Sequence, residues 1–149
     1  MILKRVLLLL LLLAISKFSN TPYLEVMHPP SWTNSSVWNH DTTLWSILRP
    51  GSEFYMSYSY GLNLEFILRK IAHLSFFGIL GLLVFLNLRE QKHRYVKAWF
   101  FGTVFAFLDE LHQAFIIGRD GRMMDVTVDS FGSALFLFLL YKSKKVSKP

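Results

Sequence analysis

Long apolar runs, separated by shorter polar or charged intervals, dominate the hydrophobic pattern of the chain. An α-helix rises 1.5 Å per residue, so about twenty apolar residues cross a hydrocarbon core about 30 Å thick. Four runs approach this length, and we expect helices at residues 1–19, 66–88, 96–117 and 126–141. The pattern predicts an all-α integral membrane protein, a small bundle of about four transmembrane helices.

The first run has a basic start, Lys4 and Arg5, followed by an unbroken apolar stretch over residues 6–15. These features are typical of a short first membrane helix, and also of the hydrophobic region of a signal peptide. We favour the retained helix. Both alternatives place the segment after Asn20 on the far side of the membrane.

Residues 20–65 form a polar and aromatic segment between the first two helices. Tryptophan and tyrosine concentrate at membrane interfaces, where their rings meet both headgroups and hydrocarbon. The segment is therefore predicted to be an extracytoplasmic, interfacial loop with one short helix on the headgroups. Its aromatic residues include Trp32, Trp38, Trp45, Tyr55, Tyr58 and Tyr60. Residues 66–141 then form a three-helix region, and 142–149 a basic tail.

Composition agrees with a membrane protein and excludes several other classes. Hydrophobic residues make up 52% of the chain, which is high for a soluble domain of this size. The net charge of +6 comes from basic residues at the ends of apolar runs, where membrane orientation explains them, so we expect no nucleic-acid partner. The absence of cysteine excludes disulfides and thiolate chemistry.

The distribution of basic residues predicts the orientation. Cytoplasmic loops of membrane proteins carry an excess of Lys and Arg. With both termini in the cytoplasm, ten of the sixteen lie inside: Lys4, Arg5, Arg89, Lys92, Arg94, Lys97, Lys142, Lys144, Lys145 and Lys148. Among the acidic residues only Glu90 lies inside. We therefore predict a multi-pass protein of the cell membrane with both termini cytoplasmic.

Residues 107–132 hold half of the acidic residues, although apolar runs flank them. Charge inside a membrane is costly and commonly marks a functional site. Asp109, counted from Lys97, and Asp129, counted from Tyr141, each lie about 18 Å from the cytoplasmic boundary. His73, counted from Arg89, lies about 24 Å from that boundary. The outer half of the membrane is thus predicted to receive ionisable groups from three helices.

Helical spacing places these groups on single faces. Residues three or four apart share a helix face, as do Asp109 and Gln113, Asp125 and Asp129, and Lys70 and His73. The turn at residues 118–122 adds two guanidinium groups, and its two glycines offer backbone amides for an anion. The predicted ligand-binding site comprises Lys70, His73, Asp109, Glu110, Gln113, Arg119, Asp125 and Asp129.

Three groups of residues in this region resemble the VanZ-like membrane proteins, a family named for a teicoplanin-resistance protein. They are Arg69–Lys70–Ile71–Ala72–His73 with Gly78 and Gly81, then residues 107–115, and finally Gly118–Arg119, Gly121, Asp125–Val126, Asp129–Ser130 and Gly132. The resemblance covers residues 67–135, and residues 18–20 more weakly. It implies a small helical protein of the bacterial plasma membrane that affects tolerance of glycopeptide antibiotics.

The chain departs from that family at one point. Members often have a sequence like His-Phe-x-Glu-Tyr where this chain has His73–Leu74–Ser75–Phe76–Phe77. A carboxylate and a phenol are therefore missing here. Any role of that acid in the family does not transfer to this chain.

Three hypotheses account for the polar layer. The first is structural: Asp109, Glu110, Asp125 and Asp129 pair with Lys70, Arg119 and Arg122 and lock the helices, in a bundle that interacts with another membrane protein. In the second, the cations hold a phosphate or carboxylate of an outer-leaflet ligand that the aromatic loop covers, such as a membrane lipid, a lipid-linked envelope precursor or a glycopeptide. We favour this hypothesis.

The third hypothesis is catalysis, as a hydrolase or transferase on a lipid-linked substrate. His73 is the candidate base, and Asp109 or Glu110 the candidate acid. Asp109 with His112, and Glu110 with Gln113, have spacings that suit shared metal coordination on one helix. No established catalytic motif accompanies them, and we predict neither a cofactor nor a metal.

Overall fold

The computed structural model describes residues 2–58, 61, 63–88 and 92–146. Tyr60, Arg89, Glu90 and Lys148, which entered the predictions above, lie outside the described residues. The predicted all-α class is confirmed. The helices are α1 (Ile2–Ser19), α2 (Leu44–Leu48), α3 (Leu64–Asn87), α4 (Arg94–Gln113) and α5 (Met123–Val146), with short 3-10 helices at Pro29–Thr33 and Glu53–Tyr55.

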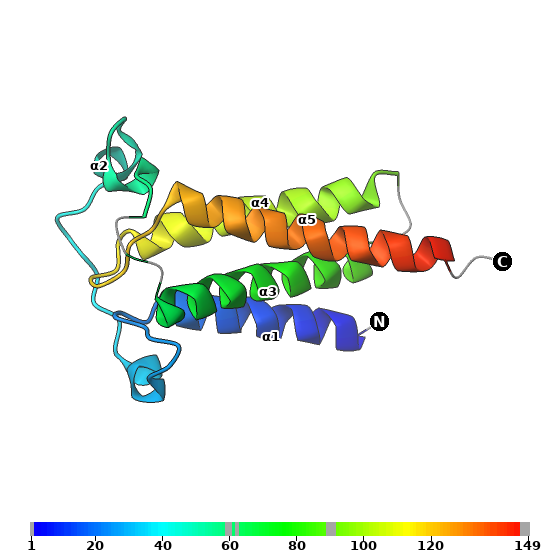
Figure 1. The fold of residues 1–149 in the computed structure, drawn as a ribbon, viewed down its shortest axis with the longest axis horizontal. Coiled ribbons are helices and arrows are strands. Elements are labelled where there is room, and N and C mark those ends of the chain that lie inside the picture. The colour runs from blue at the N-terminus through cyan, green and yellow to red at the C-terminus, as the bar shows by residue number, and fades with distance from the viewer. Residues whose placement is uncertain (1, 59–60, 62, 89–91, 147–149) are drawn as a thin grey trace.

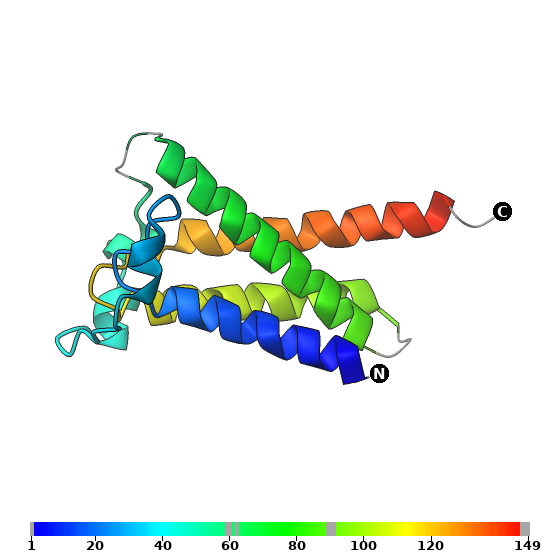
Figure 2. The ribbon, with the colours of Figure 1, turned by 90° about the horizontal axis from the view of Figure 1, so that it is seen from below.

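The four long helices pack side by side, with both termini at one end (Figure 1). The part of the chain between α1 and α3, which carries α2 and which we call the irregular segment, lies at the other end (Figure 1). Seen from below, α3 runs obliquely across the bundle, crossing α5 and ending beside α4 and α1 (Figure 2). It packs against all three of these helices. The turn between α4 and α5 lies at the same end as α2 (Figure 1).

Among the described residues, two helices are long and apolar enough to cross a membrane, namely Leu64–Asn87 and Met123–Lys145. In the other two long helices, every stretch of eighteen residues contains at least three charged side chains. α1 contains Lys4, Arg5 and Lys17 within eighteen residues. α4 contains Arg94 and Lys97 at its start and Asp109 and Glu110 near its end. Each candidate span has an eighteen-residue stretch with at most two charged side chains, because the charges of α3 and α5 gather toward the helix ends.

The helix predicted at residues 96–117 is α4, which ends earlier than predicted, at Gln113. After Gln113 the backbone forms hydrogen bonds with the irregular segment instead of continuing the helix. The Ile117 amide donates to the Val37 carbonyl at 3.0 Å, and the Asn39 amide donates to the Phe115 carbonyl at 2.8 Å. Ile116 is buried in this contact. The expectation of a longer helix was wrong because these apolar residues pack against a distant segment, which helical periodicity does not reveal.

Small residues allow α3, α4 and α5 to approach closely. Ser133 of α5 is fully buried and donates a hydrogen bond to the Phe77 carbonyl at 2.9 Å. A side chain at Gly81 or Gly102 would meet the Ser133 hydroxyl, and one at Gly132 would overlap the backbone of Leu74. This tight packing holds the polar residues of the three helices in register.

Candidate functional site

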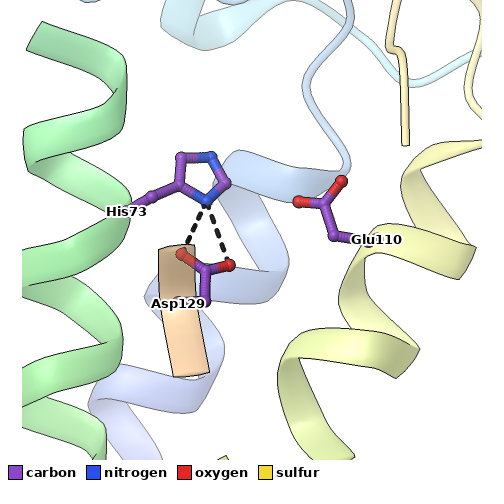
Figure 3. A group of neighbouring side chains, drawn as sticks. All are labelled: His73, Glu110 and Asp129. Carbon is purple, nitrogen blue, oxygen red and sulfur yellow. Dashed lines mark hydrogen bonds and ion pairs between the residues drawn. The ribbon is translucent and has the colours of Figure 1, made fainter. Parts of the chain in front are cut away.

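Two pairs of side chains join α3 to α5. Lys70 forms an ion pair with Asp125, and the Nδ1 atom of His73 lies 3.2 Å from each carboxylate oxygen of Asp129. Asp129 is fully buried. Figure 3 shows that the second ring nitrogen of His73 lies on the side away from Asp129. Because the contact with Asp129 fixes the orientation of the His73 ring, the direction in which the second nitrogen points is fixed as well.

Asp109 and Glu110 of α4 are buried, and their hydrogen-bond partners are neutral groups. Asp109 accepts hydrogen bonds from the Ser19 hydroxyl at 2.6 Å and from the Gln113 amide at 2.8 Å. Glu110 accepts from the backbone amide of Arg122 at 2.9 Å and from the Gln113 amide at 3.2 Å. Within the described part of the chain, neither carboxylate forms an ion pair with a lysine or arginine.

Gln113 lies between these carboxylates and Arg119. Its amide nitrogen donates to Asp109 and Glu110, and its amide oxygen accepts a hydrogen bond from Nη2 of Arg119 at 2.5 Å. Arg119 follows α4, in the turn before α5. Burial lowers the pKa of the Arg119 guanidinium, the Glu110 carboxylate opposes this shift, and the charge of Arg69 lowers the pKa further.

Tyr58 brings the irregular segment to the site. Its hydroxyl donates to Oδ1 of Asp125 at 2.5 Å, the oxygen that also pairs with Lys70. The Lys70 ammonium lies 4.2 Å from the centre of the Tyr58 ring. Burial, then the hydrogen bond to Asp125, raises the pKa of the Tyr58 phenol well above its ordinary value. Tyr58 therefore remains a donor and ties the segment to the helices.

A polar cavity of about 300 Å³ opens among these residues, and we call it the polar chamber. Its charged lining includes the basic residues Arg69, Lys70, His73, Arg119 and Arg122 and the carboxylates Glu25, Glu65, Asp120 and Asp125. Tyr23 and Tyr58 of the irregular segment contribute to its wall. The volume lies at the lower end of the range of small-ligand sites.

A second cavity of about 340 Å³, the apolar chamber, adjoins the first. Apolar side chains from α1, α3 and the irregular segment line most of it: Ile15, Phe18, Leu24, Val26, Trp32 and Phe76. Arg69, His73, Gln113 and Arg119 line both chambers. Phe76 and Phe77, the two residues that depart from the VanZ-like pattern, thus form apolar wall where a carboxylate and a phenol would stand.

The residues that offer metal ligands are His73, Glu110 and Asp129, whose ligand atoms lie within 4.8 Å of one another (Figure 3). His112, which the sequence paired with Asp109, contacts Asn20 at 3.3 Å instead. Asp129 already bonds His73, and both oxygens of Glu110 accept hydrogen bonds. Each of the three therefore has a partner within the protein: His73 and Asp129 contact each other, and Glu110 accepts from Gln113 and the Arg122 amide.

The structure brings the eight predicted site residues to one end of the bundle. Lys70 pairs with Asp125, as the structural hypothesis suggested, whereas the partner of Asp129 is His73. Arg122, expected to face the ligand, donates to the Ser57 carbonyl at 3.2 Å and pairs with Asp120 at 3.5 Å. Two amides of the turn are already bonded within the chain, that of Arg119 to the Ile116 carbonyl and that of Arg122 to the Glu110 carboxylate. A side chain at Gly121 would overlap the end of α4, so this glycine serves packing.

Three residues of the site were missed by the sequence analysis: Ser19, Tyr58 and Arg69. Arg69 lies beside Lys70 in the quoted motif, and its helical spacing to His73, four residues on, was the signal available. Ser19 belongs to the weakly matching residues 18–20. Nothing in the local sequence distinguished Tyr58 from the other aromatic residues of its segment.

A sequence profile of the family described as VanZ/LLP1 matches residues 5–144 of the chain. No curated protein and no solved structure matched. The profile spans all four long helices and the irregular segment. The irregular segment therefore belongs to the matched region together with the helices that carry the polar residues.

Proposed function

The chain belongs to the VanZ/LLP1 family, and we propose that it is a multi-pass membrane protein that binds an amphiphilic component of the cell envelope. The ligand occupies the polar and apolar chambers together. By binding an envelope lipid, a lipid-linked glycan or a drug, the protein changes the susceptibility of the cell to glycopeptides of the teicoplanin type.

One observation carries this proposal: the polar and apolar chambers adjoin, and the same five residues line both, namely Leu24, Arg69, His73, Gln113 and Arg119. A ligand with a polar head and a hydrocarbon tail would meet charged side chains at one end and Phe18, Trp32 and Phe76 at the other. Such burial of apolar ligand surface provides affinity, and the polar groups provide orientation.

We further propose four membrane spans, with both termini cytoplasmic and the chambers in the outer half of the membrane. The arrangement of the helices supports this topology, because both termini lie at the end opposite the irregular segment and the turn between α4 and α5 (Figure 1). Lys142, Lys144 and Lys145 extend α5 at the terminal end. In this orientation the buried carboxylates lie near the outer surface, where the cost of charge is lower.

Antibiotic susceptibility tests this proposal directly. The chain is produced in a sensitive bacterial host, and tolerance of teicoplanin, which has a lipid tail, is compared with tolerance of vancomycin, which has none. We expect a rise in teicoplanin tolerance that Ala72→Phe abolishes, since Ala72 lines the apolar chamber. Ile71→Phe, which adds the same ring at an exposed position of α3, should retain the effect.

Matched membrane levels and matched thermal unfolding of the two variants are required for this comparison. If the wild-type chain changes tolerance of neither drug, the proposed role in glycopeptide susceptibility is wrong. If Ala72→Phe and Ile71→Phe behave alike, the apolar chamber is not the binding site.

A second function, hydrolysis or group transfer on a lipid-linked substrate, is favoured by the orientation of His73. Asp129 contacts Nδ1 of His73, and the other ring nitrogen of His73 lies on the side away from Asp129 (Figure 3). His73 lines both chambers. A histidine held in this way can act as a general base. Purified protein incubated with an alkyl phosphate should then release inorganic phosphate, and His73→Gln should not. Absence of turnover in the wild type would leave binding as the function.

A further inference from the structure

Two guanidinium groups lie where the chambers meet, one from Arg69 of α3 and one from Arg119 of the turn before α5. Each group lines both chambers. They are close enough for the charge of Arg69 to affect Arg119. The charges of Glu110, Asp109 and Asp125 oppose the mutual repulsion of the two guanidinium groups, and an anion bound between the groups would oppose it further.

Neither guanidinium has a carboxylate partner among the described residues. Arg69 forms no hydrogen bond or ion pair there, and its Nε atom is buried without a partner. Arg119 donates to the neutral Gln113 through Nη2, and its Nε atom is likewise buried and unpartnered. Buried polar atoms without partners are uncommon, and each costs free energy until a partner is supplied.

The remaining basic groups of the polar chamber already have carboxylate partners. Lys70 pairs with Asp125, His73 with Asp129, and Arg122 with Asp120. Arg119 is linked to Asp109 and Glu110 only through Gln113, whose amide forms hydrogen bonds with all three side chains. The positive charge available to a ligand is therefore that of Arg69 and Arg119.

A phosphate group suits this pair. Guanidinium groups donate to phosphate oxygens in a planar, two-pronged geometry, and a phosphate monoester carries between one and two negative charges near pH 7. The apolar chamber next to the pair favours a ligand that also has a hydrocarbon part, because such a part would be buried against Phe18, Trp32 and Phe76.

We propose that Arg69 and Arg119 form a subsite for the phosphate monoester of a membrane lipid whose hydrocarbon chain occupies the apolar chamber. This inference rests on the proposed function, since it specifies the head of the amphiphile that the chambers bind. Arg69 and Arg119 are the residues that select the head, and the residues of the apolar chamber bind the tail. Gln113 bonds Arg119 on one side and Asp109 and Glu110 on the other, so that the guanidinium has no direct carboxylate contact there.

Binding of three probes to the purified full chain in a non-ionic detergent tests the subsite: dodecyl phosphate, dodecanol and inorganic phosphate. Native mass spectrometry or titration calorimetry provides the dissociation constants. We expect dodecyl phosphate to bind at least about tenfold more tightly than dodecanol, as two charge-assisted contacts require. Inorganic phosphate should bind far more weakly than dodecyl phosphate.

Arg69→Gln and Arg119→Gln should each weaken the binding of dodecyl phosphate at least about tenfold and leave that of dodecanol unchanged. Retained dodecanol binding also shows that a variant is folded. Arg119→Lys, which keeps the charge but loses the planar fork, should fall between wild type and Arg119→Gln. Arg49→Gln, at an exposed arginine of the irregular segment, is the matched control and should bind like wild type.

Equal affinity for dodecyl phosphate and dodecanol would overturn the subsite, as would unchanged phosphate binding in both arginine variants. Inorganic phosphate binding as tightly as dodecyl phosphate would overturn the assignment to a lipid. Failure of the proposed function has a different signature. In that case Ala72→Phe would leave dodecanol binding intact, because the tail would lie outside the apolar chamber.

Discussion

Ser19 of α1 donates a hydrogen bond to Oδ1 of Asp109 in α4 at 2.6 Å, across ninety positions of sequence. Both side chains are buried. The bond joins the end of the first helix to the polar network of the other three, since Asp109 also accepts from Gln113. The first helix therefore takes part in the site, beyond any role in membrane insertion.

Ser19→Ala should reduce the free energy of unfolding by about 1–3 kcal/mol, because a buried carboxylate loses a hydrogen-bond donor. Ser16→Ala makes the same change one turn earlier at an exposed position, and should have little effect. Denaturant or thermal unfolding in detergent measures both. If the two variants lose stability equally, the Ser19–Asp109 bond does not stabilise the fold.

Asp129→Asn should destabilise the chain by about 1–3 kcal/mol, since His73 loses its charged partner inside the bundle. Asp41→Asn, at an exposed position of the irregular segment, controls for the change of charge. Comparing unfolding with teicoplanin tolerance separates two roles of Asp129. Unchanged stability with lost tolerance would contradict a purely structural role.

Tyr58→Phe should reduce stability by about 1 kcal/mol below pH 10, because Asp125 loses a donor in a partly exposed contact. The difference should shrink at higher pH. The phenol pKa is raised in the folded chain, so above about pH 10 the unfolded chain releases a proton that the folded chain retains, and the contribution of Tyr58 is lost.

The free energies of unfolding of wild type and Tyr58→Phe, measured at about pH 8 and about pH 10.5, give this difference at each pH. Tyr55→Phe removes a hydroxyl from a more exposed tyrosine and serves as the control. A wild-type advantage over Tyr58→Phe that persists undiminished at the higher pH would refute the assignment of the contact.

Gly132→Ala should cost about 1–3 kcal/mol, since the added methyl overlaps the Leu74 backbone and forces α3 and α5 apart. Gly61→Ala meets no atom within 4 Å and should be tolerated. Thermal unfolding distinguishes the two. Because separation of these helices also moves His73 from Asp129, lipid binding should fall with Gly132→Ala. Stability equal to that of Gly61→Ala would show that the contact is looser than described.

Much of the fold was predictable because the signals for helices are local. Apolar runs indicated the four long helices, and spacings of three and four residues indicated the inward faces that carry Lys70, His73, Asp125 and Asp129. The end of α4 was not predictable. It depends on a backbone contact between residues 37–39 and 115–117, whose cause lies far away in sequence.

By itself the sequence determined the helical class, the family resemblance and the cluster of ionisable side chains, since hydrophobic period and residue type are properties of short segments. Only the tertiary structure decided the partners. It paired Lys70 and Arg122 with carboxylates, placed Gln113 between Arg119 and Asp109, and brought Arg69 to the junction of two chambers. Hydrogen bonds and ion pairs act over a few ångströms, so helix packing and the path of the irregular segment decide which charges remain available to a ligand.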